Sequence, residues 1–154
     1  MNRNLFFLFS PALFLLSCSS AKNTASSMIS QGISGTVLEK KGNQMPMKGG
    51  PSSSGKPFIT TVFIYEPTNL SQVQRTGTSP VYTAIRTKLV ASVKTDSTGS
   101  FHIQLPVGAY SLFIQQGNQY YANLFDTDNH IALFKVAEGK ITEAKLVISS
   151  GAFY

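Results

Sequence analysis

The sequence predicts an all-β protein, a seven-stranded antiparallel β-sandwich that follows a signal peptide. From residue 32 onward, short runs of β-branched and aromatic residues recur, and Gly, Pro, Asn and Asp separate them. No stretch of this region has the 3.6-residue periodicity of an amphipathic helix. Hydrophobic residues make up 42% of the 154 residues, which is enough for one core, and charged residues make up only 13%. Seven short strands at this spacing are typical of an antiparallel sandwich.

Residues 1–17 have the form of a secretory signal peptide. Arg3 gives a positively charged start, and an apolar run follows over residues 5–16. This run is shorter than the roughly 20 apolar residues that a membrane-spanning helix needs. Removal of residues 1–17 leaves twelve basic and seven acidic residues, a net charge of +5.

The end of the apolar run, Leu15-Leu16-Ser17-Cys18, resembles the lipobox of bacterial lipoproteins. In that family the cysteine thiol receives a diacylglyceryl group, signal peptidase II cuts before the cysteine, and the new N-terminus is usually acylated, with palmitate as the expected chain. Cys18 is the only cysteine, so the chain can form no internal disulfide and no multi-cysteine metal site. The alternative is an ordinary signal peptide with an incidental cysteine.

Residues 18–31 are polar and small, which predicts a lipidated flexible tether between the membrane and a domain over residues 32–154. In one group of bacterial lipoproteins an acidic cluster after the cysteine is associated with export to the cell surface. This stretch has Lys22 and no acidic residue. We therefore expect a lipid anchor in the outer membrane that faces the periplasm.

Seven strands are expected, in the order in which the apolar runs occur. They cover residues 33–38, 58–65, 87–95, 101–105, 109–115, 131–136 and 141–149. Strict alternation in the fourth places Phe101, Ile103 and Leu105 on the core face and His102 on the outer face. In the fifth, Tyr110 alternates with apolar core positions, which indicates packing.

Turns and loops connect these strands. Asp96-Ser97-Thr98-Gly99 predicts a tight turn in which Gly99 takes a positive φ, and Glu138-Gly139-Lys140 predicts a second hairpin turn. Residues 39–57 and 66–86 are rich in Gly, Pro, Ser and Thr and predict two long loops. Long loops in a compact domain are commonly functional, so these two are candidates for a contact surface.

Three segments together resemble the carboxypeptidase regulatory-like domain, a small transthyretin-like (prealbumin-like) β-sandwich common in bacterial envelope proteins. They are Gly35-Thr36-Val37 with the following residues 42–46, the turn and strand start at residues 95–101, and residues 105–112. The resemblance covers residues 32–149 and implies the fold. It implies no catalytic residue, because these domains accompany enzymes and transporters without carrying one. The two long loops depart from the family pattern, so no loop-borne site is transferred.

Asp126-Thr127-Asp128-Asn129-His130 gathers oxygen and nitrogen ligands within five residues. One interpretation is a weak divalent-cation site formed by Asp126, Asp128 and His130. The other is a polar turn in which Asp and Asn side chains bond to their own backbone. An EF-hand loop would need Gly at its sixth and Glu at its twelfth position, where Ile131 and Ala137 stand.

Tyr120, Tyr121 and Asn123 are the candidate binding residues for a sugar ring or a peptide, because aromatic side chains bury area at small entropic cost. The alternative is that these tyrosines pack in the core. The sequence has no Gly-x-Ser-x-Gly nucleophile elbow, and Cys18 is expected to carry lipid, so we expect no enzyme and no cofactor.

These features favour a membrane-anchored, non-catalytic module that binds or assembles with a protein partner of the envelope. A glycan- or peptide-binding lipoprotein that uses the long loops and exposed tyrosines is the second hypothesis. A metal protein or enzyme centred on residues 126–130 is the third. The lysines are scattered rather than clustered and an exported protein meets little nucleic acid, so we expect no nucleic-acid partner. The oligomeric state stays open.

Overall fold

The computed structural model describes residues 31–43, 55–75 and 77–153, and these residues form an all-β fold. They contain eleven β-strands and one short 3-10 helix. The elements are β1 (Gly32–Asn43), β2 (Lys56–Pro57), β3 (Thr61–Tyr65), η1 (Leu70–Gln72), β4 (Val73–Arg75), β5 (Val81–Ile85), β6 (Leu89–Lys94), β7 (Ser100–Gln104), β8 (Gly108–Gln116), β9 (Gln119–Tyr121), β10 (Leu133–Val136) and β11 (Ile141–Phe153). Within this part of the chain, no helix has the length and apolar character to cross a membrane.

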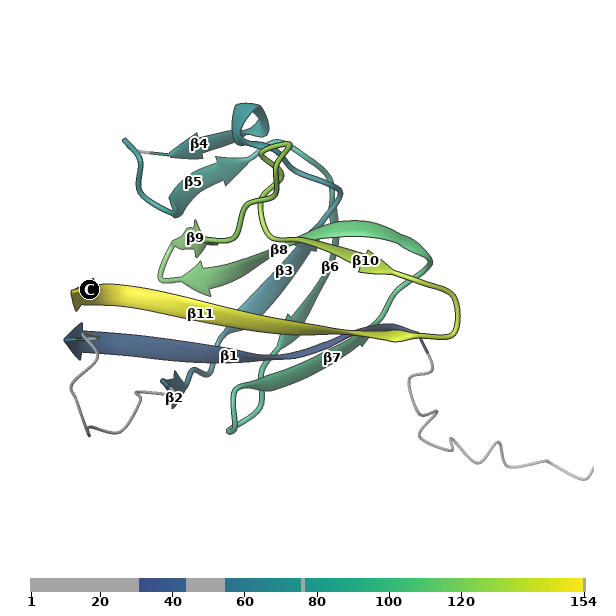
Figure 1. Ribbon diagram of the computed structural model, residues 1–154, viewed down its shortest axis with the longest axis horizontal. Helices are drawn as coiled ribbons and strands as arrows, with labels where there is room; N and C mark the ends of the chain where they lie inside the picture. Colours follow the sequence, from purple (N-terminus) through teal and green to yellow (C-terminus); the bar gives the residue numbers. More distant parts are fainter. Residues whose placement is uncertain (1–30, 44–54, 76, 154) are drawn as a thin grey trace, which may run out of the picture.

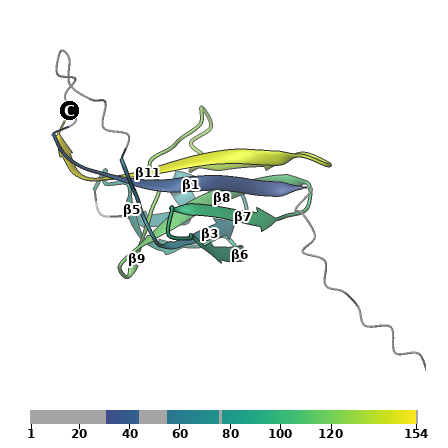
Figure 2. The same ribbon diagram turned by 90° about the horizontal axis from the view of Figure 1, so that it is seen from below.

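The strands form two sheets (Figure 1). In the smaller sheet, β1 lies between β11 on one side and β2 and β7 on the other. The larger sheet has the order β4-β5-β9-β8-β3-β6, and β10 also pairs with β8. Figure 2 shows β11 and β1 along one side of the molecule and β3 and β6 along the other. This arrangement is consistent with a β-sandwich.

The longest pairing of the smaller sheet is parallel. β1 and β11 run side by side in the same direction, from Gly32 opposite Ile141 to Asn43 opposite Phe153. The prediction of a wholly antiparallel sandwich is wrong for this pair. Parallel neighbours need a long connection between them, and here nearly the whole domain connects the first strand to the last. Such a pairing has no local sequence signal.

The main core lies between the two sheets. Ile33 and Val37 of β1, Phe101 of β7 and Ile64 of β3 are all buried in it. The alternation predicted for residues 101–105 is confirmed: the three apolar side chains pack toward the core, and His102 is exposed. The predicted packing of Tyr110 is confirmed as well.

A second apolar cluster covers the other face of the larger sheet. Ser111 and Phe113 of β8 are buried there, so β8 is covered on both faces. Phe113 contacts Tyr65 and Tyr82 edge to face, with ring centroids 5.6 Å apart in both pairs. Tyr82 lies on β5, so the chain between β3 and β6 extends the larger sheet with β4 and β5 and contributes to this cluster.

The expectation of a long loop at residues 66–86 is therefore wrong. This segment contains η1, β4 and β5. The strand count of seven is also too low. β2, β4 and β9 are only two or three residues long, and β5, although mostly apolar, lies in a segment whose Gly, Thr, Ser and Pro residues predicted a loop. Of the other expected loop, residues 39–43 continue β1 and 55–57 include β2, while residues 44–54 lie outside the described residues.

The turn predicted at residues 96–99 is confirmed. Gly99 has φ 75° and its N–H donates to the Asp96 carbonyl at 3.0 Å. The turn at residues 138–140 also forms, with Gly139 at φ 63° and a Lys140 N–H that donates to the Ala137 carbonyl. It is not a hairpin turn, however, because β10 and β11 belong to different sheets. Local sequence marks a change of direction but not the sheet that the next strand joins.

Acidification should loosen the turn at Asp96. Hydrogen bonds from the Thr98 hydroxyl and from the Ser100 and Thr98 N–H groups hold the pKa of Asp96 below its usual value. A lowered folded-state pKa gives a stabilisation that is complete above the unfolded pKa, about 3.9, and is lost as the pH falls through the folded value. We expect the Ser100 amide proton to shift in an NMR titration over that acidic window. In Asp96→Asn this titration should disappear, and a persistent shift in the variant would contradict the assignment.

Candidate functional site

The structure separates the two candidate tyrosines. Tyr121 is only 3% exposed, and its hydroxyl accepts a hydrogen bond from the Ser149 N–H at 3.1 Å. Tyr120 is half-buried. Because successive side chains of a strand point to opposite faces, β9 sends one ring into the main core and the other to the opposite face. The expectation of two exposed tyrosines is therefore wrong for Tyr121.

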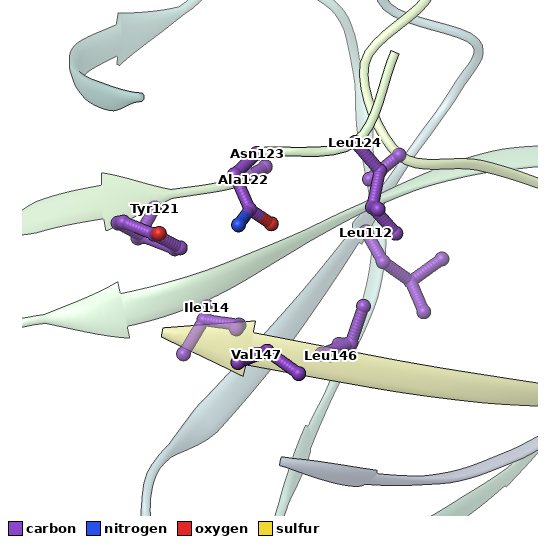
Figure 3. Close-up of a pocket in the computed structure, with 9 residues that line it drawn as sticks. Leu112, Ile114, Tyr121, Ala122, Asn123, Leu124, Leu146 and Val147 are labelled. Atoms are coloured by element: carbon purple, nitrogen blue, oxygen red, sulfur yellow. The ribbon is translucent and has the colours of Figure 1, made fainter. Parts of the chain in front are cut away.

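Tyr121 and Asn123 line a narrow crevice between the chain that follows β9 and strands β8 and β11, and the Asn123 amide points toward these strands (Figure 3). The other lining side chains are mostly aliphatic and include Leu112, Leu124 and Leu146. Its volume is about 10 Å³, the room of a single water molecule. Sites for small organic ligands are commonly at least 300 Å³. The crevice is therefore too small for such a ligand, and Tyr121 contributes to the packing of the core.

Tyr120 borders a larger hollow at the turn between β8 and β9. We call this feature the amide hollow; its volume is about 200 Å³, too small to enclose a ligand but enough to contact one face of a ring. It is lined by Phe63, Gln115, Gly117, Asn118, Gln119 and Tyr120. None of these side chains carries a charge. The hollow thus combines two aromatic rings with amide groups that donate and accept hydrogen bonds.

Aromatic contacts hold the Tyr120 ring in place. It meets Phe63 edge to face at 5.3 Å and Tyr65 at 6.2 Å between ring centroids. Burial raises the pKa of Tyr65, and the neighbouring Tyr120 raises it further. The edge-to-face contacts with Phe63 and Tyr65 thus fix the position of the Tyr120 ring.

The β8–β9 hairpin presents the amides. Gln115 pairs with Tyr120 across it, and Gly117 takes φ 59° in the turn. The Thr60 hydroxyl donates to the Gln115 carbonyl at 2.8 Å and ties the hairpin to the chain before β3. Rings beside neutral hydrogen-bonding groups suit a ligand with one apolar face and several hydroxyl or amide groups. Phe63 and Gln115 were not predicted as binding residues; the amide-rich run at residues 115–119 is the sequence signal that indicates the hollow.

The three predicted metal ligands do come together. Ligand atoms of Asp126, Asp128 and His130 all lie within 4.8 Å of one another. Oδ1 of Asp126 accepts hydrogen bonds from the N–H groups of Asp128 and His130, at 2.9 and 2.8 Å. Oδ2 of Asp126 lies 3.0 Å from Nδ1 of His130. These atoms could hold a divalent cation, and the same contacts also close the turn as the alternative interpretation requires.

The Asp126 carboxyl group is set up to remain ionised. Desolvation raises its pKa, but hydrogen bonds from His130 and Asp128 outweigh this effect, so that the pKa of Asp126 is lowered. Beside the turn, Asn69 and Leu70 border an open depression with Asp128. The Asp126 carboxylate, at the start of the turn, accepts hydrogen bonds from the N–H groups of Asp128 and His130 and so stabilises the turn.

Comparison with known proteins adds no relative. The chain matches no protein-family model, no curated protein and no solved structure.

Proposed function

We propose that this chain is a lipid-anchored, non-catalytic binding module of the bacterial cell envelope, attached to the outer membrane and facing the periplasm. The observation that carries the proposal is Leu15-Leu16-Ser17-Cys18, the lipobox-like end of the apolar run, with the only cysteine of the chain at its last position. A β-rich domain begins 13 residues after that cysteine, at Gln31. One acyl chain binds a membrane only marginally, whereas several give stable attachment.

Attachment would raise the concentration of the module near a membrane partner without any new contact. Two strands could receive such a partner, because β11 forms an edge of the smaller sheet and β6 an edge of the larger one. Unpaired strand edges can bind an extended segment of another protein by main-chain hydrogen bonds. We propose an envelope protein as the partner.

Membrane fractionation tests the anchor. We expect the wild-type protein to stay in the membrane fraction after an alkaline wash and to need detergent for release. Cys18→Ala removes the lipid-accepting thiol and should leave an uncut precursor, whereas the matched control Ser17→Ala should behave as wild type. Release of the wild-type protein by the wash would contradict the proposal. Crosslinking of the anchored protein, followed by mass spectrometry, should then identify one stoichiometric envelope protein.

A second function, binding of a neutral saccharide, is favoured by the amide hollow. Its Tyr120 and Phe63 rings and its uncharged amides match the alternating apolar and hydroxyl surfaces of a sugar ring. We expect neutral oligosaccharides to shift the NMR signals of Asn118 and Gln119, and Tyr120→Ala to abolish these shifts. Tyr120→Phe keeps the ring and should retain binding. Shifts spread over the whole surface, or unchanged in Tyr120→Ala, would contradict this function.

We also propose that the fold is of the transthyretin-like kind, with additional short strands. Two features support this. The turn with Gly99 leads directly into buried Phe101, and a second turn after Leu105 leads into β8, in the order that the resemblance implies.

A further inference from the structure

The chain enters the folded domain at a fixed point. The Gln31 side-chain amide donates a hydrogen bond to the Leu105 carbonyl at 2.9 Å, and its carbonyl oxygen accepts one from the Gly139 N–H at 3.1 Å. The Gly32 N–H donates to the Lys140 carbonyl at 3.1 Å. Gln31 is therefore clamped between the turn before β8 and the turn before β11. In Figure 1 the start of β1 and the turn between β10 and β11 lie at one end of the molecule.

Apolar side chains are exposed at this same end. Val107 is 60% exposed and Ile141 is 44% exposed. Val107 precedes Gly108, which pairs with Val136, and Ile141 pairs with Gly32. Val107 and Ile141 therefore belong to chain segments that meet around Gln31. We call Pro106, Val107, Lys140 and Ile141 the entry face.

The entry face has the chemistry of a membrane-contacting surface. Transfer of valine and isoleucine side chains out of water is favourable, by roughly 25 cal/mol for each Å² of apolar area that is buried. Lys140 adds a positive charge next to them, which anionic lipid headgroups attract, while Glu138 in the same turn opposes it. The charges of Lys140 and Glu138 balance each other, so apolar contact contributes more than electrostatic attraction to the binding of the entry face to a membrane.

We infer that the entry face rests on the lipid surface that carries the anchor, and that the amide hollow faces away from it. This inference depends on the proposed lipid at Cys18. The stretch from Cys18 to Gln31 can span at most about 45 Å and joins the domain at Gln31, so it brings the entry face within reach of the membrane. Because this reach exceeds the length of the domain, contact of the exposed Val107 and Ile141 with lipid is what sets the orientation. β8 starts at the entry face and ends at the hollow, and its nine residues cover about 30 Å.

Tryptophan quenching tests this orientation, because the chain contains no tryptophan. Val107→Trp places a single reporter on the entry face, and Asn118→Trp places the matched control at the exposed β8–β9 turn. Each full-length, lipidated variant is reconstituted into phosphatidylglycerol vesicles with and without dibrominated phosphatidylcholine. We expect the brominated lipid to quench Val107→Trp at least several-fold more strongly than Asn118→Trp. Equal quenching, or stronger quenching of Asn118→Trp, would overturn the inference.

Flotation of the vesicles separates the two ways in which the experiment can fail. Protein that does not float with the vesicles carries no lipid, which overturns the anchor and the orientation together. Protein that floats but shows no quenching of Val107→Trp retains the anchor and overturns the orientation alone. Ile141→Trp provides a second entry-face reporter if Val107→Trp does not fold, which circular dichroism reports.

Discussion

Gly35→Ala should destabilise the domain by at least about 2 kcal/mol, because the added methyl group has no room. Gly35 lies at the centre of the smaller sheet, opposite Ala144 of β11 and Phe101 of β7. A Cβ atom at this position would overlap the Ala144 carbonyl oxygen and lie 3.0 Å from the Phe101 ring. The overlapping oxygen is a backbone atom, so the parallel strand itself would have to move. Urea unfolding of the wild type and the variant measures the change.

Ser34→Ala is the matched control for this prediction. Ser34 is the preceding residue of the same strand, and its side chain is only partly buried. We expect its effect to stay within about 0.5 kcal/mol. If the two variants had the same stability, β1 and β11 would not be packed in the described register.

Phe113→Ala should cost about 3–5 kcal/mol, the usual range for a fully buried phenylalanine. Its ring is completely buried in the second cluster and contacts Tyr65 and Tyr82. The loss should appear as a lower midpoint of urea unfolding. Phe125→Ala removes the same side chain at a site that is 45% exposed and should cost less than about 1 kcal/mol. Similar costs for the two would show that Tyr65 and Tyr82 do not enclose the Phe113 ring.

Local periodicity predicted the strands that have one buried and one exposed face. β7 is the clearest case, because Phe101 within it and Leu105 just after it are buried while His102 is exposed. The Gly99 turn was predictable for a similar reason, since Asp, Ser, Thr and Gly form such turns through contacts within four residues. In both cases the relevant forces act between near neighbours in the sequence.

Contacts between distant segments could not be predicted in this way. The burial of Phe113 depends on Tyr82, which lies on a short strand in a segment that has the composition of a loop. The parallel pairing of β1 and β11 joins the two ends of the domain. Neither contact leaves a repeating pattern in the sequence, and both depend on how the chain crosses from one sheet to the other.

The candidate sites likewise divide into one formed by near neighbours in the sequence and one formed by distant segments. Asp126, Asp128 and His130 come together because one short turn carries them all. For the tyrosines, residue type alone did not distinguish Tyr120 from Tyr121, because the direction of each ring depends on how β9 pairs with β8. The amide hollow also needs Phe63 from β3, far away in the sequence.

The central claim is that lipid on Cys18 anchors this domain, and the intact mass of the mature protein from cells tests it most directly. The account predicts a chain that begins at Cys18 and carries the added mass of a diacylglyceryl group and an N-terminal acyl chain. Cys18→Ala should lack this addition and retain residues 1–17. A wild-type chain with an unmodified cysteine would contradict the account.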